Sequence, residues 1–282
     1  MSMQDKVVVV TGATSGIGEV AADRLAQKGA RIVFIARDRD RGEATRKHLH
    51  AIAGHATHTV HYADLAKLAD MKRVAKEIAD SEPQIDVLVN NAGAMFTTRQ
   101  VTEDGLERTF ALNHMSYFVV TNLLLDRLKA TPGARIVSTA SDAHRGAKLN
   151  FDDPQSERAY SGFSVYGRSK LMNILFTREL AKRLAGTGIT ANCLHPGFVN
   201  TRFGQNNGGL MGGVIKVAQN FALTPEQGAE TIIWLADSDE VAGKSGGYYV
   251  KKALTTPTRE ARNDADAKRL WDISAKIAGV GF

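Results

Sequence analysis

The sequence predicts an α/β protein built on a doubly wound parallel sheet with helices on both faces. Short runs rich in valine and isoleucine alternate with longer segments whose apolar residues recur every three or four positions. The short runs are nearly continuous in apolar residues, which is typical of parallel strands buried on both faces. Strands that alternate with helices in this way form doubly wound sheets.

The elements follow one another in a regular order. Strands are expected wherever a short apolar run occurs, at 7–10, 31–36, 57–62, 85–89, 135–138, 189–194 and 247–250. The run at 57–62 is the weakest of them. Helices are expected where apolar residues take helical spacing, at 19–28, 39–51, 68–81, 105–130, 165–184 and 225–236. No change in composition marks a second unit, so residues 1–282 are predicted to form a single domain.

Two segments depart from this alternation. Residues 143–163 form a long polar insertion before the helix at 165–184. Residues 198–224 combine glycines with apolar side chains beyond the end of a predicted strand. A glycine-hinged, partly apolar segment in this position predicts a substrate lid. A surface loop packed on the domain explains the same residues equally well.

Composition excludes several classes of protein. Apolar residues make up 43% and charged residues 23% of the chain, which are ordinary globular values. The single cysteine, Cys193, cannot form an internal disulfide, which fits a reducing compartment. The first residues do not form a signal peptide, and no stretch of eighteen apolar residues occurs. We therefore expect no membrane span and a cytoplasmic location.

Charge and histidines indicate neither a nucleic acid nor a metal as partner. The formal net charge is +6, but Lys and Arg are interleaved with Asp and Glu, as on a solvated mixed surface. Histidines are frequent in one stretch, at His48, His50, His55, His58 and His61. Their spacing is irregular and no cysteine lies among them, so we expect solvated histidines and no metal site.

A glycine-rich turn follows the first strand. Residues 11–18 read TGATSGIG, between the predicted strand and the predicted helix. Glycines allow the tight turn and let a pyrophosphate approach the backbone, while the helix N-terminus offers free N–H groups and a positive dipole. The sequence thus predicts a Rossmann-type nucleotide site, with contacts from Gly12, Ser15, Gly16, Ile17 and Gly18.

The end of the second strand bears on the choice of cofactor. The residue about twenty positions beyond the glycine motif meets the adenosine ribose in such folds. Arg37 stands nineteen positions after Gly18, and a base there suits the additional phosphate of NADP. Arg41 is expected to assist, so NADP(H) is favoured over NAD(H). Asp38 leaves an alternative, because its carboxylate could bond a ribose hydroxyl if it turned inward.

Tyr166 and Lys170 are four residues apart on the predicted helix 165–184, so they project from the same face. A phenol has a reference pKa of about 10, too high for base work near neutrality. We expect the ammonium of Lys170 to stabilise the phenolate and lower the pKa of Tyr166. The tyrosine would then act as general acid or base on a substrate oxygen.

At this point the sequence resembles the short-chain dehydrogenase/reductase family over nearly its whole length. The glycine turn has this family's T-G-x-x-x-G-x-G form, and Tyr-x-x-x-Lys is the family's catalytic signature. Further matches occur in the family's order along the chain, at Asp64-Leu65, Asn90-Asn91-Ala92-Gly93, Asn113, Ser141 and Pro196-Gly197. The second half is most similar to the retinol-dehydrogenase-like branch, as in Leu194-His195-Pro196-Gly197 and the tail with Leu270, Trp271 and Ser274.

The resemblance implies a role for each matching residue. Tyr166 would exchange a proton with the substrate oxygen, and Ser141 would orient that oxygen. Lys170 would hold the nicotinamide ribose, and Asn113 would position a water that links Lys170 to solvent. Further cofactor contacts are implied for Asp64, Leu65, Asn91, Ala92, Gly93, Pro196, Gly197, Val199 and Thr201.

Several of these residues have simpler explanations. Asn113 could only cap or bridge backbone groups, and Asp64 could be the N-cap of the helix that follows it. Asn90 and Asn91 could merely shape their turn. Ser138 is a weaker rival to Ser141, because strand alternation places the two differently.

The sequence as a whole predicts an NADP-dependent oxidoreductase. It would transfer a hydride between the nicotinamide and the carbonyl or alcohol carbon of a small apolar aldehyde, ketone or alcohol. The resemblance also implies a possible homodimer or homotetramer. The alternative is a non-catalytic NADP-sensing protein on the same fold, although a sensor has no need of a phenol–ammonium pair.

Overall fold

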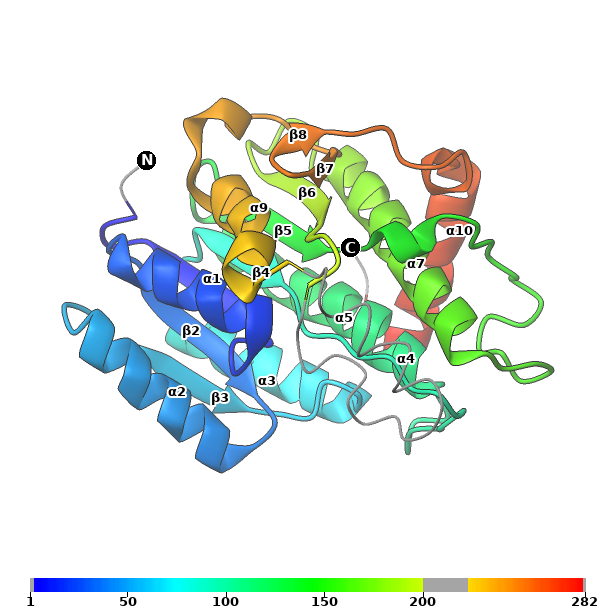
Figure 1. The fold of residues 1–282 in the computed structure, drawn as a ribbon, viewed down its shortest axis with the longest axis horizontal. Helices are drawn as coiled ribbons and strands as arrows, with labels where there is room; N and C mark the ends of the chain where they lie inside the picture. The colour runs from blue at the N-terminus through cyan, green and yellow to red at the C-terminus, as the bar shows by residue number, and fades with distance from the viewer. Residues whose placement is uncertain (1–2, 200–222, 281–282) are drawn as a thin grey trace.

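The computed structural model describes residues 3–199 and 223–280. Within these residues one eight-stranded sheet runs through the molecule in the order β3-β2-β1-β4-β5-β6-β7-β8 (Figure 1). Neighbouring strands are parallel except for β7 and β8, which are antiparallel. The strands are β1 (Val7–Thr11), β2 (Arg31–Ala36), β3 (Thr59–Tyr62), β4 (Val87–Asn90), β5 (Arg135–Thr139), β6 (Thr190–His195), β7 (Tyr248–Val250) and β8 (Ala253–Leu254).

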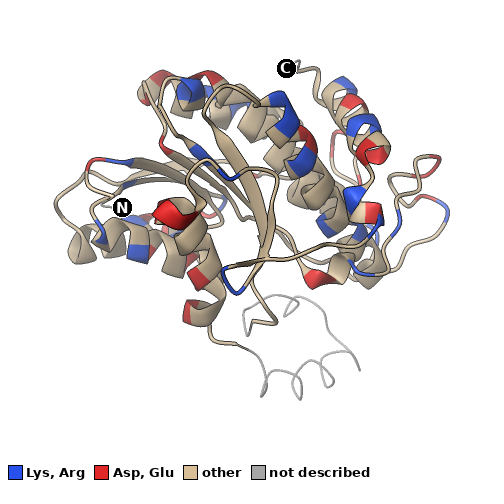
Figure 2. Ribbon diagram, turned by 90° about the horizontal axis from the view of Figure 1, so that it is seen from above, with Lys and Arg blue, Asp and Glu red and all other residues tan. Residues whose placement is uncertain are grey.

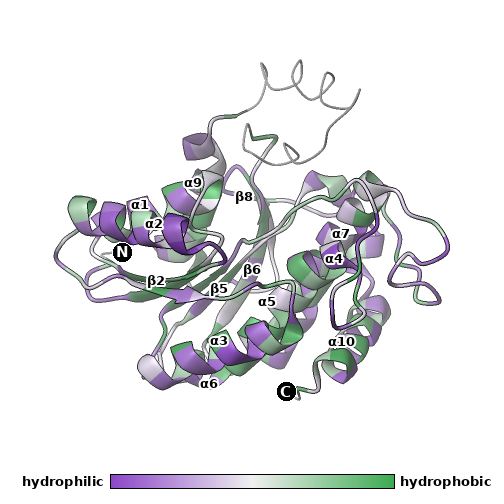
Figure 3. Cartoon of the chain, turned by 90° about the horizontal axis from the view of Figure 1, so that it is seen from below, coloured by the Kyte–Doolittle hydropathy of each residue, from purple (hydrophilic) through white to green (hydrophobic). Residues whose placement is uncertain are grey.

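Helices cover both faces of this sheet, which confirms the predicted doubly wound fold. One apolar core lies beneath α1 (Gly16–Gln27), α2 (Arg39–Ile52) and α9 (Pro225–Asp237). The other lies beneath α3 (Leu68–Ser81), α5 (Ser116–Leu123) and α7 (Gly162–Arg183), and α10 (Asp264–Ala278) packs against α7. The hydropathy colouring in Figure 3 shows the apolar helix faces turned toward the sheet.

The segment predicted as one helix at 105–130 is helical over most of its length, but the structure divides it into four pieces. They are α4 (Arg108–Phe110), a π-helical turn (Ala111–Met115), α5 and α6 (Leu125–Lys129). The helix begins at Arg108 because the Glu107 carboxylate accepts from the backbone N–H groups of Thr109, at 2.8 Å, and Phe110, at 2.7 Å. The π turn adds a residue to one helical turn, a feature often found near functional sites.

Two further elements were not predicted. Strand β8 forms a hairpin with β7 through Lys251 and Lys252, both of which have positive φ angles, 49° and 64°. Such a turn usually contains asparagine or glycine, so two lysines gave no signal for it. The other is α10, which begins behind an Asn263 side chain that accepts from the N–H groups of Ala265 and Asp266.

The two segments that break the alternation differ in what the structure shows. In the insertion 143–163, regular structure is confined to its edges, a 3-10 turn at Asp142–His144 and the start of α7 at Gly162. The predicted lid at 198–224 falls almost entirely outside the described residues. Its described ends meet, since Val199 pairs with Leu223 and the Leu223 N–H donates to Phe198 O at 2.7 Å.

The outer helix faces carry charges of both signs, as the sequence predicts (Figure 2). Many of these charges pair locally. Arg73, for example, bonds both Asp70 and Glu77 on α3. Of the helices in the described ranges, none combines the length and apolar character needed to cross a membrane.

Candidate active site

The glycine turn holds α1 against the end of β1. Gly12 and Gly16 have φ angles of 73° and 61°, which favour glycine. A Cβ on Gly18 would lie 2.2 Å from Gly12 O and 2.4 Å from Asn91 Nδ2. Ser15 stands at the N-cap of α1, but its exposed side chain makes no capping hydrogen bond. The first N–H groups of α1 are therefore open to an anionic ligand.

Thr11 and Asn91 tie together the ends of three strands. The Thr11 hydroxyl accepts from the N–H groups of Asn91, at 2.8 Å, and Ala92, at 3.0 Å. The Asn91 amide donates to Thr11 O and Gly12 O, and its oxygen accepts from Thr139 Oγ1 at 3.2 Å. Asn91 thus links β1, β4 and β5 and does more than shape its own turn.

Asn90 makes different contacts from Asn91. It is buried, and its amide donates to the Thr121 hydroxyl on α5 at 2.8 Å. Asn90 thereby ties the end of β4 to a helix, whereas Asn91 faces the glycine turn.

At the end of β2, Arg37 and Arg41 are exposed. Neither guanidinium has an ion-pair partner in the described part of the chain. Asp38 is the N-cap of α2, where its Oδ1 accepts from Arg41 N at 2.9 Å. Arg39 lies 4.6 Å from the centroid of the Tyr62 ring. Asp38 is therefore engaged in a cap, while two cations face solvent where the ribose is expected.

Asp64 does not cap α3, so that alternative is wrong. Its Oδ1 accepts from Ala66 N at 3.0 Å, and its own N–H donates to Asp70 at 2.8 Å. Helix α3 begins at Leu68, whose N–H is bonded by Asp104 Oδ2 at 2.8 Å. Leu65 is buried in the core.

Ser141, Tyr166 and Lys170 come together at the carboxyl end of β5. Ser141 is the N-cap of the 3-10 turn, and its side chain hydrogen-bonds the phenol of Tyr166. Lys170 Nζ lies 5.5 Å from the centroid of the Tyr166 ring and donates to Thr139 O at 3.1 Å. Ser138 lies within β5 and is buried, so it does not compete with Ser141.

Burial has the largest effect on the pKa values of Tyr166 and Lys170. It raises the pKa of Tyr166 above its ordinary value, and the hydrogen bond from Ser141 offsets only part of that increase. Burial also lowers the pKa of Lys170 to about 7. The expected lowering of the pKa of Tyr166 by Lys170 is therefore not found. The physical reason is that loss of hydration disfavours both charged forms more than their mutual attraction favours them.

Asn113 lies in the π-helical turn and is fully buried. Its Oδ1 accepts from Ala94 N and its Nδ2 donates to Ala94 O, both at 2.9 Å. Nδ2 also donates to Ser169 Oγ at 3.0 Å. Asn113 thus bridges backbone groups, as the simpler explanation requires, and does so beside Lys170. A Cβ on Gly93 would come within 3.2 Å of Asn113 Oδ1 and 3.5 Å of Lys170 Nζ.

The loop after β6 lies beside the glycine turn. Gly197, which follows Pro196, has a φ angle of 90°. A Cβ on Gly228 of α9 would lie 2.6 Å from Val199 Cγ2 and 2.7 Å from Ile17 Cγ2. Val199 and Ile17 therefore meet at the start of α9, as two contacts of one ligand would require. Thr201 lies outside the described residues.

Sequence reasoning missed three residues that support this site. Thr11 holds Asn91, Thr139 provides the carbonyl for Lys170, and Ser169 accepts from Asn113. Thr11 and Thr139 both stand at the ends of predicted strands, which was the available signal. Ser169 gave a weaker one, as a polar residue next to Lys170.

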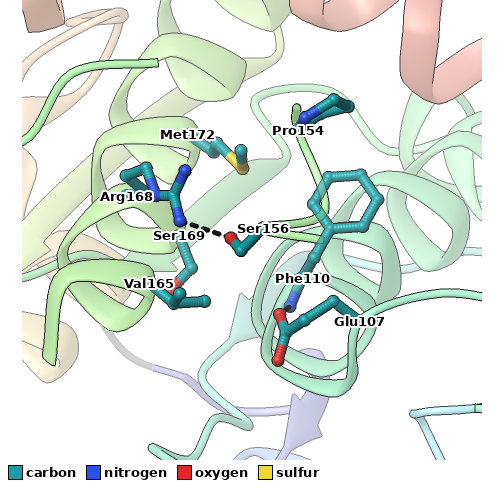
Figure 4. Close-up of a pocket in the computed structure, with 8 residues that line it drawn as sticks. All are labelled: Glu107, Phe110, Pro154, Ser156, Val165, Arg168, Ser169 and Met172. Atoms are coloured by element: carbon teal, nitrogen blue, oxygen red, sulfur yellow. Dashed lines mark hydrogen bonds between the residues drawn. The ribbon is translucent and has the colours of Figure 1, made fainter. Parts of the chain in front are cut away.

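A small pocket lies between α4, α7 and the insertion 143–163 (Figure 4). Arg168 donates to Ser156 across it. Tyr166 and Lys170 are not among its lining residues, which are Glu107, Phe110, Pro154, Ser156, Val165, Arg168, Ser169 and Met172. This pocket is a seam where the insertion packs on α7. Over the described ranges, no three His, Cys, Asp or Glu side chains gather where they could hold a metal ion.

The sheet, the glycine turn and the tyrosine–lysine helix together define a class, the oxidoreductases that use a nicotinamide dinucleotide. A family model of short chain dehydrogenases matches residues 6–209. The chain belongs to the short-chain dehydrogenase/reductase family, and within it to the retinol-dehydrogenase-like branch.

The relatives extend over almost the whole chain. Human retinol dehydrogenase 14 is 39% identical over 99% of this chain and 88% of its own length. Human retinol dehydrogenase 13 is 38% identical over 98% and 85%. A crystal structure of an uncharacterised protein from Mycobacterium paratuberculosis is 31% identical with a TM-score of 0.81, covering 100% of this chain and 96% of the other. A short chain dehydrogenase from Burkholderia cenocepacia in complex with NADP is 25% identical with a TM-score of 0.72, covering 90% and 100%.

Proposed function

We propose that this oxidoreductase uses NADP(H) to interconvert small apolar aldehydes or ketones and their alcohols. Tyr166 is the general acid or base in this proposal. The observation that carries it is the convergence of Ser141, Tyr166 and Lys170 beside the glycine turn. These three groups come from the turn after β5 and from α7, and general acid–base chemistry on a substrate oxygen accounts for their meeting.

The residues present fit a dinucleotide. Gly12 and Gly18 let α1 begin close against the end of β1 and Asn91, and the open start of α1 favours a pyrophosphate. The residues that would hold the remainder are Gly16, Ile17, Asp64, Leu65, Asn91, Ala92, Gly93, Pro196, Gly197, Val199 and Thr201. The bound cofactor supplies or accepts the hydride.

The side chains of the protein control the proton. Because burial raises the pKa of Tyr166, its phenol is protonated at neutral pH and can donate to a carbonyl oxygen. Ser141 is placed to hydrogen-bond the same oxygen. Lys170 has a pKa of about 7 and lies 5.5 Å from the centroid of the Tyr166 ring, so its charge can adjust the proton affinity of the phenol.

The preference for NADP rests on charge. Arg37 and Arg41 present two exposed cations at the end of β2, whereas Asp38 is used as a helix cap. A phosphate on the ribose would pair with such cations. The Burkholderia relative, solved with NADP, supports the same choice.

The apolar substrate rests on relatives and on exposed aromatic side chains. Proteins named retinol dehydrogenases are the relatives reported above. In this chain Phe163 is 64% exposed and lies one helical turn before Tyr166, and Phe198 is 57% exposed after β6. An apolar substrate would cover such surfaces.

The first experiment is turnover of purified protein with NADPH and, separately, NADH against a panel of apolar aldehydes and ketones. We expect oxidation of NADPH to be faster than that of NADH and to disappear in Tyr166→Phe. Binding of NADPH without turnover of any carbonyl would favour the alternative, a non-catalytic NADP sensor. If neither cofactor binds, the assignment of the glycine turn is wrong. A cytoplasmic location, a homodimer or homotetramer, and a lid near 198–224 remain predictions.

A further inference from the structure

His114 follows Asn113 in the π-helical turn and is fully buried. Its Nε2 lies 2.8 Å from Ser274 Oγ on α10. Ser274 donates its own proton to Leu270 O at 2.8 Å, so its oxygen must accept from His114. His114 therefore carries its proton on Nε2 and links the π turn to the C-terminal helix.

Besides Ser274, the side chain of Asn173 and two aromatic rings surround His114. Its ring centroid lies 5.5 Å from that of Phe110 and 6.3 Å from that of Phe176. Burial lowers the pKa of His114 to about 3, which favours its neutral form. Its contacts with Ser274 and with the flanking rings indicate a role in geometry.

His114 can fix the position of the residue before it, Asn113. The Asn113 amide bonds both backbone groups of Ala94 and donates to the Ser169 hydroxyl. That hydroxyl in turn donates to the backbone carbonyl oxygen of Tyr166 at 2.7 Å. Gly93, just before Ala94, lies against both Asn113 and Lys170. A shift of the π turn would move Asn113, then the Ala94 segment and the environment of Lys170.

We propose that His114, held by Ser274, is a positioning residue that fixes the π turn so that Asn113 sets the site around Tyr166 and Lys170. The C-terminal helix is thereby part of the machinery that places the reacting groups, although it is far from them in sequence. The expected effect on kcat rests on the proposed function. The link from His114 through Asn113 to Ala94 does not depend on that function.

The test compares two ways of breaking this link with one conservative replacement. Ser274→Ala removes the acceptor and is the milder change, and His114→Leu removes the donor. His114→Gln keeps a terminal N–H that can replace Nε2. Trp271→Phe is the matched control, because it loosens the packing of α10 on Phe118 and Phe176 but leaves both partners of the His114–Ser274 hydrogen bond in place.

The first readout is residue-resolved hydrogen exchange of the Ala94 amide in protein without cofactor. We expect it to accelerate about tenfold or more in Ser274→Ala and His114→Leu, as the Asn113 bond weakens. Wild-type rates are expected in His114→Gln and Trp271→Phe. An unchanged Ala94 rate in Ser274→Ala would overturn the inference, even if its melting temperature falls.

The second readout is the pH profile of kcat. We expect kcat to fall on the order of tenfold in Ser274→Ala with KM nearly unchanged, and the apparent pKa of the profile to move. His114 does not titrate in this range, so a moved profile reports on Lys170 and Tyr166. A profile identical to that of Trp271→Phe would contradict a positioning role. Absence of turnover in the wild type, with a response at Ala94, would refute the proposed function and leave the geometric link standing.

Discussion

Lys170 is almost completely buried and its ammonium has the Thr139 carbonyl as an acceptor. A folded-state pKa of about 7 lies well below the 10.5 of an exposed lysine. Between these values the unfolded chain binds the proton that the folded chain lacks. The free energy of unfolding therefore rises with pH across this interval, by up to about 1.4 kcal/mol per pH unit from this group. Below pH 7 both states are protonated and the contribution is constant.

Lys170→Met tests this linkage. The variant should be more stable than the wild type at pH 6.5 in the absence of cofactor, and its advantage should shrink as the pH rises to 8.5. The comparison between the two proteins cancels other titrating groups, such as Cys193, whose pKa burial raises to about 12. Urea unfolding at several pH values measures the difference in the free energy of unfolding between the variant and the wild type. A difference that does not change with pH would show that Lys170 is charged throughout.

The exposed cations at the end of β2 allow a test of cofactor choice. Arg37→Ala is expected to raise KM for NADPH about tenfold and to leave that for NADH nearly unchanged, since it removes one charge-assisted bond to phosphate. Arg41→Ala should act in the same direction. Arg39→Ala is the matched control, because Arg39 lies over the Tyr62 ring. Equal losses with both cofactors would argue against a phosphate contact.

At the scale of elements, the approach of α1 to β1 depends on Gly18. The nearest obstacle to a Cβ is the backbone oxygen of Gly12, which cannot rotate away as a side chain would. Gly18→Ala should lower the free energy of unfolding by about 2 kcal/mol and abolish nucleotide binding. Chemical denaturation and NADPH fluorescence measure the two effects.

Gly133→Ala is the control for that experiment. Gly133 also has a positive φ, of 74°, but a Cβ there meets no atom within 4 Å. It should lose about 1 kcal/mol from backbone strain alone and bind NADPH normally. Normal binding by Gly18→Ala would mean that the turn does not hold the pyrophosphate.

At the scale of the whole molecule, α10 closes the core on one side of the sheet. Trp271 lies 4.9 Å from Phe118 and 5.8 Å from Phe176, measured between ring centroids, and the Arg183 guanidinium covers its ring at 4.4 Å. These partners come from α5 and from α7, the helix that carries the tyrosine–lysine pair. The end of the chain therefore stabilises the helices that form the site.

Trp271→Ala should accordingly reduce the free energy of unfolding by about 3–5 kcal/mol, because it leaves a large cavity among aromatic rings. Guanidinium unfolding followed by circular dichroism measures it. A loss below about 1 kcal/mol would mean that α10 is only loosely attached.

The sequence by itself determined the order of the first seven strands and of the helices between them, the glycine turn and the Tyr166–Lys170 spacing. These are local properties: apolar period, glycine content and residues one helical turn apart. It also offered Ser141 and Asn113 as candidate site residues, because they match residues of a family that the sequence resembles.

Only the tertiary structure decided what depends on contacts between distant segments. It began the helix predicted at 105–130 at Arg108, where buried Glu107 caps α4, and it inserted the π turn that places Asn113 against Ala94 and Ser169. It used Asp38 as a cap, and it set the pKa values of Tyr166 and Lys170 by burial rather than by their spacing. Desolvation and long-range hydrogen bonds depend on what the fold packs around a residue, and no local pattern records them.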